Sequence, residues 1–335
     1  MAVLVTGGAG YIGSHLTLEL VDNGEDVIVL DNLSTGVRRL VPEGARFVEG
    51  DIGDDALLQR VFAGGEIEAV LHFAGSIVVP DSVSDPLGYY LNNTVKSRAL
   101  LAAAVAHGVK GFIFSSTAAV YGIPERVPVA EDAPLQPISP YGASKMMTER
   151  MLADTAAAHP LNYCALRYFN VAGADAASRS GQATPRATHL IKVACEVVTG
   201  QRPYLQIFGN DYPTTDGTCV RDYIHVTDLA RAHWHALKHL RSGGGNMVLN
   251  CGYGRGYSVL EVIETVKRVS GMDFEVRFSD RRAGDPSELI AATDRIRDVL
   301  PWNPQFADLD LIVEHALNWE KKLNAQRRSM KTAAE

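Results

Sequence analysis

Short apolar runs alternate with longer amphipathic segments along the first half of the chain. The short runs are typical of buried strands, whereas the longer segments repeat their apolar residues with helical periodicity. Strands that alternate with helices form parallel sheets through right-handed crossovers, with helices on both faces. The pattern predicts an α/β fold with a doubly wound parallel sheet, built from strands at residues 2–6, 26–31, 46–49, 69–73, 111–115 and 162–167 and helices at residues 12–23, 54–62, 83–107 and 141–159.

The pattern changes after Arg167. Residues 172–186 are rich in glycine, alanine and serine and predict a loop, and residues 209–217 form a second turn-rich stretch. Apolar helices are expected at residues 190–198 and 226–240. We therefore expect one domain at residues 1–168 and a smaller C-terminal lobe at residues 169–335, with part of residues 218–250 packing back on the sheet.

Composition limits the classes of partner. The chain has 335 residues, of which 46% are hydrophobic and 21% charged, as is usual for a soluble globular protein. Its formal net charge of -7 argues against nucleic acid or an anionic membrane as a partner. The four cysteines have no paired spacing, so neither a disulfide framework nor a metal site is expected. Because no apolar run reaches the ~20 residues of a membrane span and no signal peptide is recognisable, we expect a soluble, cytoplasmic protein.

A glycine cluster, TGGAGYIG at residues 6–13, lies between the first predicted strand and the first predicted helix. It has the G-x-G-x-x-G spacing of the Rossmann fold, in which glycines let a pyrophosphate approach the backbone at a helix N-terminus. Asp31 ends the second predicted strand, where a carboxylate accepts hydrogen bonds from the adenosine ribose and repels a 2′-phosphate. The two features together predict an NAD site rather than an NADP site.

Two further groups follow predicted strands on the same side of the sheet. Asp51 and Ile52 come after the third strand, at a position that suits the adenine, although an ordinary surface position is the alternative. Phe73, Ala74 and Gly75 end the fourth strand, where small residues would let the cofactor lie close to the sheet edge.

Tyr141 and Lys145 form a Y-x-x-x-K pair at the start of a predicted helix. Ser139 and Pro140 precede them as the expected N-cap and first-turn residue. The four-residue spacing places the phenol and the amine on one helix face. A nearby ammonium favours the phenolate, as does the positive ring of an oxidised nicotinamide. Tyr141 is therefore the candidate general base that takes a proton from a substrate hydroxyl.

The fifth predicted strand ends in the hydroxyl residues Ser115, Ser116 and Thr117. Ligands of parallel sheets bind beyond the carboxyl ends of the strands, which is where these hydroxyls fall. We expect the hydroxyl partner of Tyr141 to come from this run.

In this order, the motifs resemble those of the extended short-chain dehydrogenase/reductases and, within them, the UDP-galactose 4-epimerases. The stretch VRDYIHV at residues 220–226 is especially characteristic. The resemblance implies NAD-dependent inversion at C4 of a UDP-hexose through a transient 4-keto sugar, which turns over in the pocket while the UDP stays bound. It runs over nearly the whole chain and is carried by residues 7–15, 31–33, 73–75, 89–93, 115–122, 141–145, 168–170, 208–212, 217–230 and 281–285.

The resemblance also implies roles for individual residues. Tyr141 would be the catalytic base, Lys145 its electrostatic partner, and Thr117 the hydroxyl that assists at the sugar. Arginines can bind a diphosphate bidentately, which suits the two arginines in the substrate set. The cofactor would contact Gly7, Gly10, Tyr11, Ile12, Gly13, Asp31, Asn32, Asp51, Ile52, Phe73, Ala74, Gly75, Asn92, Ser115 and Phe169, besides Tyr141 and Lys145. The UDP-sugar would contact Asn170, His189, Leu190, Gln206, Ile207, Phe208, Arg221, Arg282 and Asp285, besides Thr117 and Tyr141.

Four residues depart from the family pattern. Thr117 stands where the assisting hydroxyl is often a serine, and it keeps the oxygen while adding a methyl group. Ile77 stands where a lysine often contacts the cofactor, so cofactor retention can differ. His189 stands where an asparagine often contacts the substrate. Leu289, at the position that limits sugar size, is smaller than the tyrosine of strict hexose epimerases. UDP-N-acetylhexosamines, UDP-pentoses and UDP-uronates therefore stay open as substrates.

Other functions of the same fold are less favoured. Dehydratases of this type place an Asp-Glu pair after the fifth strand, and decarboxylases place a glutamate two residues after the threonine. Here Thr117 is followed by Ala118 and Ala119. Non-enzymatic NAD(H) sensors usually lack the tyrosine or the lysine, and both are present. By resemblance we also expect a homodimer, with an interface built from the predicted helices at residues 83–107 and 141–159.

Overall fold

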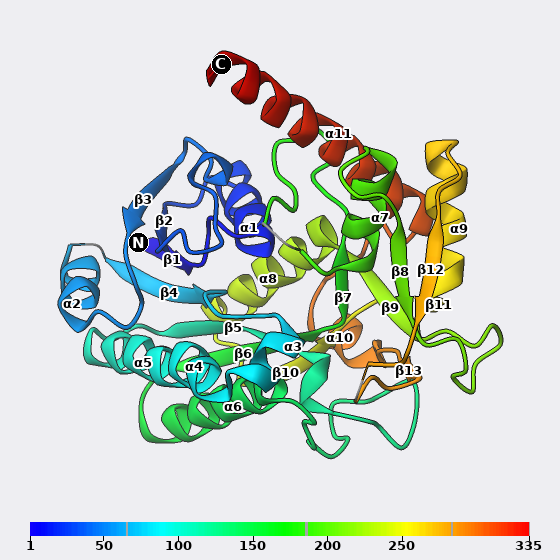
Figure 1. Cartoon of the computed structure of the whole chain (residues 1–335). Coiled ribbons are helices and arrows are strands. Elements are labelled where there is room, and N and C mark those ends of the chain that lie inside the picture. The colour runs from blue at the N-terminus through cyan, green and yellow to red at the C-terminus, as the bar shows by residue number, and fades with distance from the viewer. Residues whose placement is uncertain (65, 185–186, 283, 335) are drawn as a thin grey trace.

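The fold is organised around a seven-stranded parallel sheet with the strand order β10-β6-β5-β4-β1-β2-β3 (Figure 1). The computed structural model describes residues 1–64, 66–184, 187–282 and 284–334. The order reverses between β1 and β4, as in a doubly wound sheet, so the fold class predicted from the sequence is confirmed. The strands are β1 (Ala2–Thr6), β2 (Val27–Asp31), β3 (Ala45–Glu49), β4 (Ile67–His72), β5 (Gly111–Thr117), β6 (Asn162–Tyr168) and β10 (Met247–Cys251).

Helices cover both faces of this sheet because successive residues of each strand point to opposite sides. In β1, Val3 and Val5 join the core under one helical layer, whereas Leu4 joins the core under the other. The first layer contains α1 (Tyr11–Asp22), α8 (Val226–Arg241) and α10 (Asp294–Val299), and the second contains α2 (Asp55–Ala63), α5 (Lys96–Ala106) and α6 (Pro140–Ala158).

The single helix predicted at residues 83–107 is wrong. The chain instead forms α3 (Val79–Ser84), α4 (Pro86–Tyr90), a π-helical turn (Leu91–Val95) and α5. Pro86 has no N–H and restricts the residue before it, so α3 ends and Asp85 caps the next helix by accepting a hydrogen bond from the Gly88 N–H. The sequence contains this Asp-Pro break, which helical periodicity alone overlooks.

The remaining elements form a lobe beside the carboxyl ends of β4, β5 and β6 (Figure 1). Residues 185 and 186 of the loop predicted at residues 172–186 lie outside the described residues. The chain returns from the lobe through α8 and β10, and β10 pairs with β6. The lobe comprises β7 (Asn170–Ala172), β9 (Val220–His225), β11 (Gly256–Ser258) and β13 (Glu288–Leu289) in one sheet, β8 (Leu205–Phe208) and β12 (Val276–Ser279) in another, and the helices α7 (Leu190–Val198), α9 (Val259–Ser270) and α11 (Leu309–Ala334).

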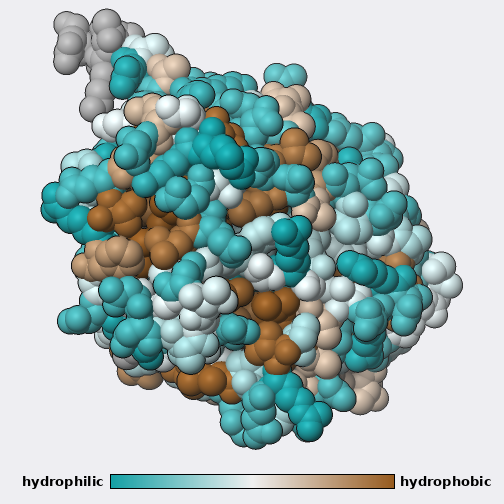
Figure 2. Space-filling view, turned by 90° about the vertical axis from the view of Figure 1, so that its right-hand side faces the viewer, coloured by the Kyte–Doolittle hydropathy of each residue, from teal (hydrophilic) through white to brown (hydrophobic). Residues whose placement is uncertain are grey.

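The surface is mostly hydrophilic on the face that Figure 2 shows, with a few separate hydrophobic areas. Among the described residues, no helix has the length and the apolar character needed to cross a bilayer.

Three buried histidines predict how stability depends on pH. Burial lowers the pKa of His15 to about 4, of His72 to about 3 and of His233 to about 4. In the unfolded chain these histidines bind protons below about pH 6.5, whereas in the folded chain they stay neutral at that pH. The free energy of unfolding therefore decreases as the pH falls below about 6.5. Each histidine contributes a slope of about 1.4 kcal/mol per pH unit.

Urea unfolding of the wild type at several pH values below about 6.5 should show this loss. The variant His72→Gln should lose one histidine's share of the slope. The control variant is His107→Gln, because that histidine is exposed. Equal slopes for His72→Gln and the wild type would contradict the assignment.

Candidate functional site

The glycine turn between β1 and α1 lies against the end of β4. Gly7 has a φ of 73°, and a Cβ atom built on it would lie 2.6 Å from the backbone nitrogen of Ala74. A Cβ atom on Gly13 would lie 2.2 Å from the carbonyl oxygen of Gly7. Gly10 is the N-cap of α1, and no side chain caps that helix. The turn therefore brings backbone close together at a helix N-terminus, which is the arrangement that a pyrophosphate requires.

Asp31 lies at the end of β2, beside this turn. Its carboxylate accepts hydrogen bonds from the N–H groups of Ala9 at 2.9 Å and Leu33 at 2.8 Å. Burial raises the pKa of Asp31, and the two N–H groups counteract that rise. A buried carboxylate held by the glycine turn fits the ribose hydroxyls of NAD and repels a third phosphate.

Asp51 and its neighbours form a polar group one strand further along. Asp51 accepts hydrogen bonds from Lys96 Nζ at 2.6 Å and from Asn32 Nδ2 at 3.0 Å. Burial raises the pKa of Asp51, but these two contacts and the Gly53 N–H outweigh burial and lower it. Ile52 is buried in the core beneath. Asn32 and Asp51 therefore lie together, as one wall of the predicted adenine region.

Tyr141, Lys145 and Thr117 come together where α6 crosses the end of β5. Ser139 caps α6 as predicted, accepting a hydrogen bond from the Gly142 N–H at 3.2 Å. Lys145 is buried, and its Nζ donates to the carbonyl oxygen of Ser115 at 2.8 Å. The Thr117 hydroxyl interacts with the Tyr141 phenol. The Ser115 side chain bonds to the Tyr168 hydroxyl.

Burial dominates the electrostatics of this group. Burial raises the pKa of Tyr141 to about 12, and the Thr117 hydroxyl offsets part of the rise. Burial lowers the pKa of Lys145 to about 8. The sequence predicts that Lys145 and an oxidised nicotinamide together favour the phenolate, and in the chain alone the Lys145 ammonium is directed to the Ser115 carbonyl. The residues of the chain position the phenol without making it acidic.

A buried ion pair that the sequence analysis missed holds α6 against the sheet. Glu149, one turn after Lys145, forms a bidentate pair with Arg167 of β6, with Nε–Oε1 at 2.9 Å and an Nη–Oε2 distance of 2.6 Å. Glu149 also accepts a hydrogen bond from Ser116, which lies between Ser115 and Thr117. The Y-x-x-x-K-x-x-x-E spacing puts Glu149 on the Lys145 face, but only the fold brings Arg167 to it.

Asn93, rather than Asn92, makes the extensive contacts beside the catalytic group. Asn93 is buried, accepts from the Ser76 N–H at 2.7 Å and donates to Ser144 Oγ at 3.1 Å. Asn92 donates to Ser76 Oγ at 2.9 Å. A Cβ atom on Gly75 would lie 3.1 Å from Asn93 Oδ1, so the Phe73–Gly75 segment passes close to this asparagine. The π-helical turn at Leu91–Val95 places Asn93 on the inner face.

On the lobe side, each of the two predicted diphosphate arginines contacts another residue of the predicted substrate set. Arg221 lies 3.8 Å from Asp285, and the Arg282 guanidinium lies 3.8 Å from the Phe208 ring centroid. Strand β13 pairs with β9, which aligns Leu289 with Arg221. Gln206 is exposed and donates to Ser279, Ile207 is buried in the lobe core, and Phe169 is buried beside Leu289.

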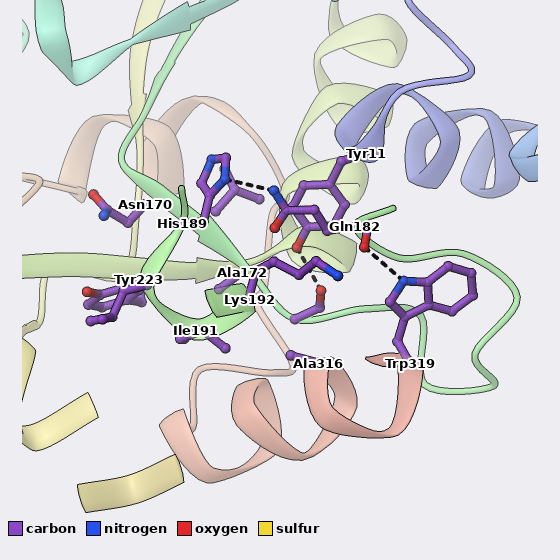
Figure 3. A pocket seen from close by; sticks show the side chains of 13 residues that line it. Tyr11, Asn170, Ala172, Gln182, His189, Ile191, Lys192, Tyr223, Ala316 and Trp319 are labelled. Carbon is purple, nitrogen blue, oxygen red and sulfur yellow. Dashed lines mark hydrogen bonds between the residues drawn. The ribbon is translucent and has the colours of Figure 1, made fainter. Parts of the chain in front are cut away.

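Asn170, His189 and Leu190 line a small cavity together with Tyr11 (Figure 3). The cavity has a volume of about 20 Å³, which is room for a water molecule rather than a sugar. The Tyr11 hydroxyl donates to the carbonyl oxygen of Gly173 at 2.7 Å, so its ring points into the lobe. The cavity therefore joins the glycine turn to residues predicted to hold the substrate.

Comparisons with known proteins agree with this geometry. The model of the NAD dependent epimerase/dehydratase family matches residues 3–252. The chain is 60% identical to a UDP-glucose 4-epimerase of Azospirillum brasilense over 96% of this chain and 92% of that relative. A UDP-glucose 4-epimerase from Brucella ovis in complex with NAD is 44% identical, covers 95% of this chain and 98% of its own, and has a TM-score of 0.92. One from Bifidobacterium longum in complex with NAD⁺ and UDP is 38% identical over 96% and 98% of the two chains, with a TM-score of 0.91.

The buried pair of Arg167 and Glu149 gives a stability prediction. Arg167→Met should lower the free energy of unfolding by about 3–5 kcal/mol, because it leaves the Glu149 carboxylate buried without its partner. The double variant Arg167→Met/Glu149→Leu should regain most of the loss, since it removes both charges. Urea unfolding measures both values.

The matched control lies on the exposed side of the same helix. Arg150 pairs with Asp154 at 2.9 Å, with both side chains more than half exposed. Arg150→Met should cost under about 1 kcal/mol. If Arg167→Met also lowers the free energy of unfolding by less than about 1 kcal/mol, the buried pair does not hold α6 in place.

Proposed function

Because the chain belongs to the NAD dependent epimerase/dehydratase family, we propose that it inverts C4 of a UDP-hexose and interconverts UDP-galactose and UDP-glucose with NAD as cofactor. The observation that carries this proposal is the meeting of Tyr141, Lys145 and Thr117 at the end of β5, within the same sheet edge as the glycine turn. Without a carboxylate after Thr117, elimination or decarboxylation has no acid or base at that position.

The residues of the first domain fit NAD. Gly7 and Gly13 let the backbone of the turn pack closely at the start of α1, and Asp31 offers a buried carboxylate for the ribose. NAD, when bound, supplies a hydride acceptor and a positive charge beside Tyr141. We assign residues 1–168, with the returning segment at 218–250, to cofactor binding and residues 169–335 to the UDP-sugar.

Tyr141 is the group that removes the proton from the C4 hydroxyl in this proposal. Its pKa of about 12 in the protein alone means that a further positive charge has to lower it. Lys145, one helical turn after Tyr141, donates to the Ser115 carbonyl, and Thr117 orients the substrate hydroxyl through its contact with the phenol. The same phenol would return the proton to the C4 oxygen once the 4-keto sugar has turned and a hydride has been delivered to its opposite face, which leaves C4 inverted.

The UDP is the fixed part of the substrate, and the sugar is the part that turns. Arg221, Arg282 and Asn170 are assigned to the diphosphate because guanidinium groups match it bidentately. Asp285, beside Arg221, is assigned to the ribose. Leu289 packs beside Phe169 at the sugar end, where its size leaves the choice between hexose and N-acetylhexosamine to experiment.

The experiment that tests the function uses the purified chain with UDP-galactose and, separately, with UDP-N-acetylgalactosamine, each with and without added NAD. Anion-exchange chromatography resolves the products. We expect UDP-glucose from the first substrate. Tyr141→Phe should lose about 10²- to 10⁴-fold in kcat.

A control variant separates catalysis from folding. Tyr163→Phe removes a hydroxyl near the start of β6, at the opposite end of the sheet from the site, and should retain wild-type kcat. Conversion of both substrates would mean that Leu289 admits the larger sugar. No conversion of UDP-galactose, even with added NAD, would overturn the proposed function.

A homodimer is proposed from an exposed apolar stripe. Val83, Leu87, Leu91 and Val95 recur every four residues and are 64%, 79%, 54% and 53% exposed. They run along α3, α4, the π-helical turn and the boundary of α5, and α4 and α5 contact α6 (Figure 1). Apolar side chains this exposed mark an interaction surface. A reducing cytoplasm is proposed as the location because all four cysteines are free and buried.

Leu87→Glu should convert the dimer to a monomer, because it places a charge in the stripe. Sedimentation velocity at micromolar concentration measures the change. Met272→Glu is the control, since Met272 is also exposed, at 48%, but lies after α9 in the lobe. A wild-type chain that sediments as a monomer, or a Leu87→Glu variant that stays dimeric, would contradict this interface.

A further inference from the structure

Two side chains that line the cavity between the glycine turn and the lobe, those of Gln182 and His189, contact each other. Gln182 Nε2 lies 2.7 Å from His189 Nδ1, and the two side chains point toward each other in Figure 3. Gln182 is buried, with 7% of its surface exposed, and comes from the loop before α7. His189 is the N-cap residue of α7, and its side chain makes no capping bond.

This contact determines which ring nitrogen carries the proton. With its Nε2 toward the ring, the Gln182 amide donates and Nδ1 of His189 accepts. In a neutral imidazole the proton is then on Nε2, which becomes a hydrogen-bond donor. Burial also lowers the pKa of His189, which disfavours the doubly protonated ring.

The charges around the cavity are matched, so none of them draws a second proton onto the ring. Lys192 is buried and bonds to Glu320 of α11, and it lies 3.4 Å from Glu196. Arg202 donates to Glu196 at 2.5 Å. Two cations therefore face two carboxylates. The titratable groups of the other elements are the phenols of Tyr11 on α1 and Tyr223 on β9, and burial raises the pKa of both.

The backbone of Gln182 is fixed by separate contacts. Its carbonyl oxygen accepts a hydrogen bond from Trp319 Nε1 of α11 at 3.1 Å (Figure 3). The same loop is tied to α1, because Ser180 bonds to Ser14 at 2.7 Å and the Asp175 N–H donates to His15 at 3.1 Å. A side chain on a backbone held from two directions can orient its partner.

We propose that Gln182 is a positioning residue that holds His189 as a neutral ring with its proton on Nε2, so that this N–H is presented to an oxygen of the UDP-sugar. The proposal rests on the proposed function for the identity of the substrate. His189 then acts as a neutral hydrogen-bond donor and not as a cation that binds the diphosphate by charge. The ring acts here as an amide N–H would, which fits a histidine at a position where an asparagine serves in similar enzymes.

The ring proton can be observed directly. Long-range ¹H–¹⁵N spectra of histidine report the tautomer, and the signals of His189 are identified by their loss in His189→Asn. We expect the Nε2–H tautomer in the wild type. In Gln182→Glu, the carboxylate should accept from Nδ1–H and give the imidazolium at about pH 7.5, with both ring nitrogens protonated. An Nδ1–H ring in the wild type overturns the proposal.

Binding of UDP, measured by calorimetry, tests the consequence without requiring turnover. Gln182→Leu should weaken UDP roughly 3- to 10-fold, as expected for the loss of one oriented hydrogen bond. Gln182→Glu should bind UDP at about pH 7.5 and lose affinity as the pH rises toward about 9, since deprotonation turns Nε2 into an acceptor. The wild-type affinity should stay level over this range.

A double-mutant cycle separates positioning from packing. In the His189→Asn background, Gln182→Leu should have little further effect on UDP affinity, because there is no ring to orient. An equal loss in both backgrounds would show that Gln182 only fills space and would overturn the proposal. Failure of the epimerase function alone would appear as absent conversion of UDP-galactose with the UDP affinities and the tautomer still as stated.

Discussion

The site depends on the hydrogen bond from the buried amine of Lys145 to the backbone of β5. The Lys145 Nζ donates to the carbonyl oxygen of Ser115 at the end of strand β5, and no carboxylate of the described residues forms an ion pair with it. A carbonyl compensates an ammonium less well than a carboxylate would, which is why burial lowers the pKa of Lys145 to about 8. The arrangement persists because α6 is held to the sheet by another pair, Glu149 with Arg167. The unfavourable burial of the Lys145 amine is therefore at the site, and the ion pair of Glu149 with Arg167 that holds the helix lies one helical turn away.

Burial also determines the protonation of Tyr141. The phenol is positioned by α6 and by Thr117, but its pKa is raised to about 12 because burial dominates. The chain therefore prepares the geometry of the base and leaves its ionisation to a positive charge from outside the chain. Coupling base strength to the presence of an oxidised cofactor would keep the tyrosine inert whenever that cofactor is missing.

The parts that could be predicted from the sequence are those that depend on local pattern. The strands, the glycine turn, Asp31 and the capped start of α6 each follow from residues close together in the chain. The break before Pro86 was also local, and it was missed because helical periodicity continued through it. Contacts such as those of Arg167 with Glu149 and of Gln182 with His189 depend on how β6, α6 and the lobe loop meet in space, and no spacing rule encodes them. The direction of the Lys145 amine also depends on the fold, since it is set by the end of strand β5.

The return of the chain to the sheet connects the lobe to the catalytic group. After the lobe, β10 pairs with β6, and Asn250 of β10 accepts a hydrogen bond from the Tyr121 hydroxyl at 2.7 Å. Tyr121 in turn accepts from Arg167 at 3.0 Å, the arginine that holds α6. On the other side, Tyr11 of the glycine turn donates to Gly173 of the lobe. The lobe is thus joined both to the helix that carries Tyr141 and to the turn that suits a pyrophosphate. A substrate anchored to the lobe by its nucleotide would be held at a defined distance from the base, while its sugar, beyond the last of these contacts, is free to turn.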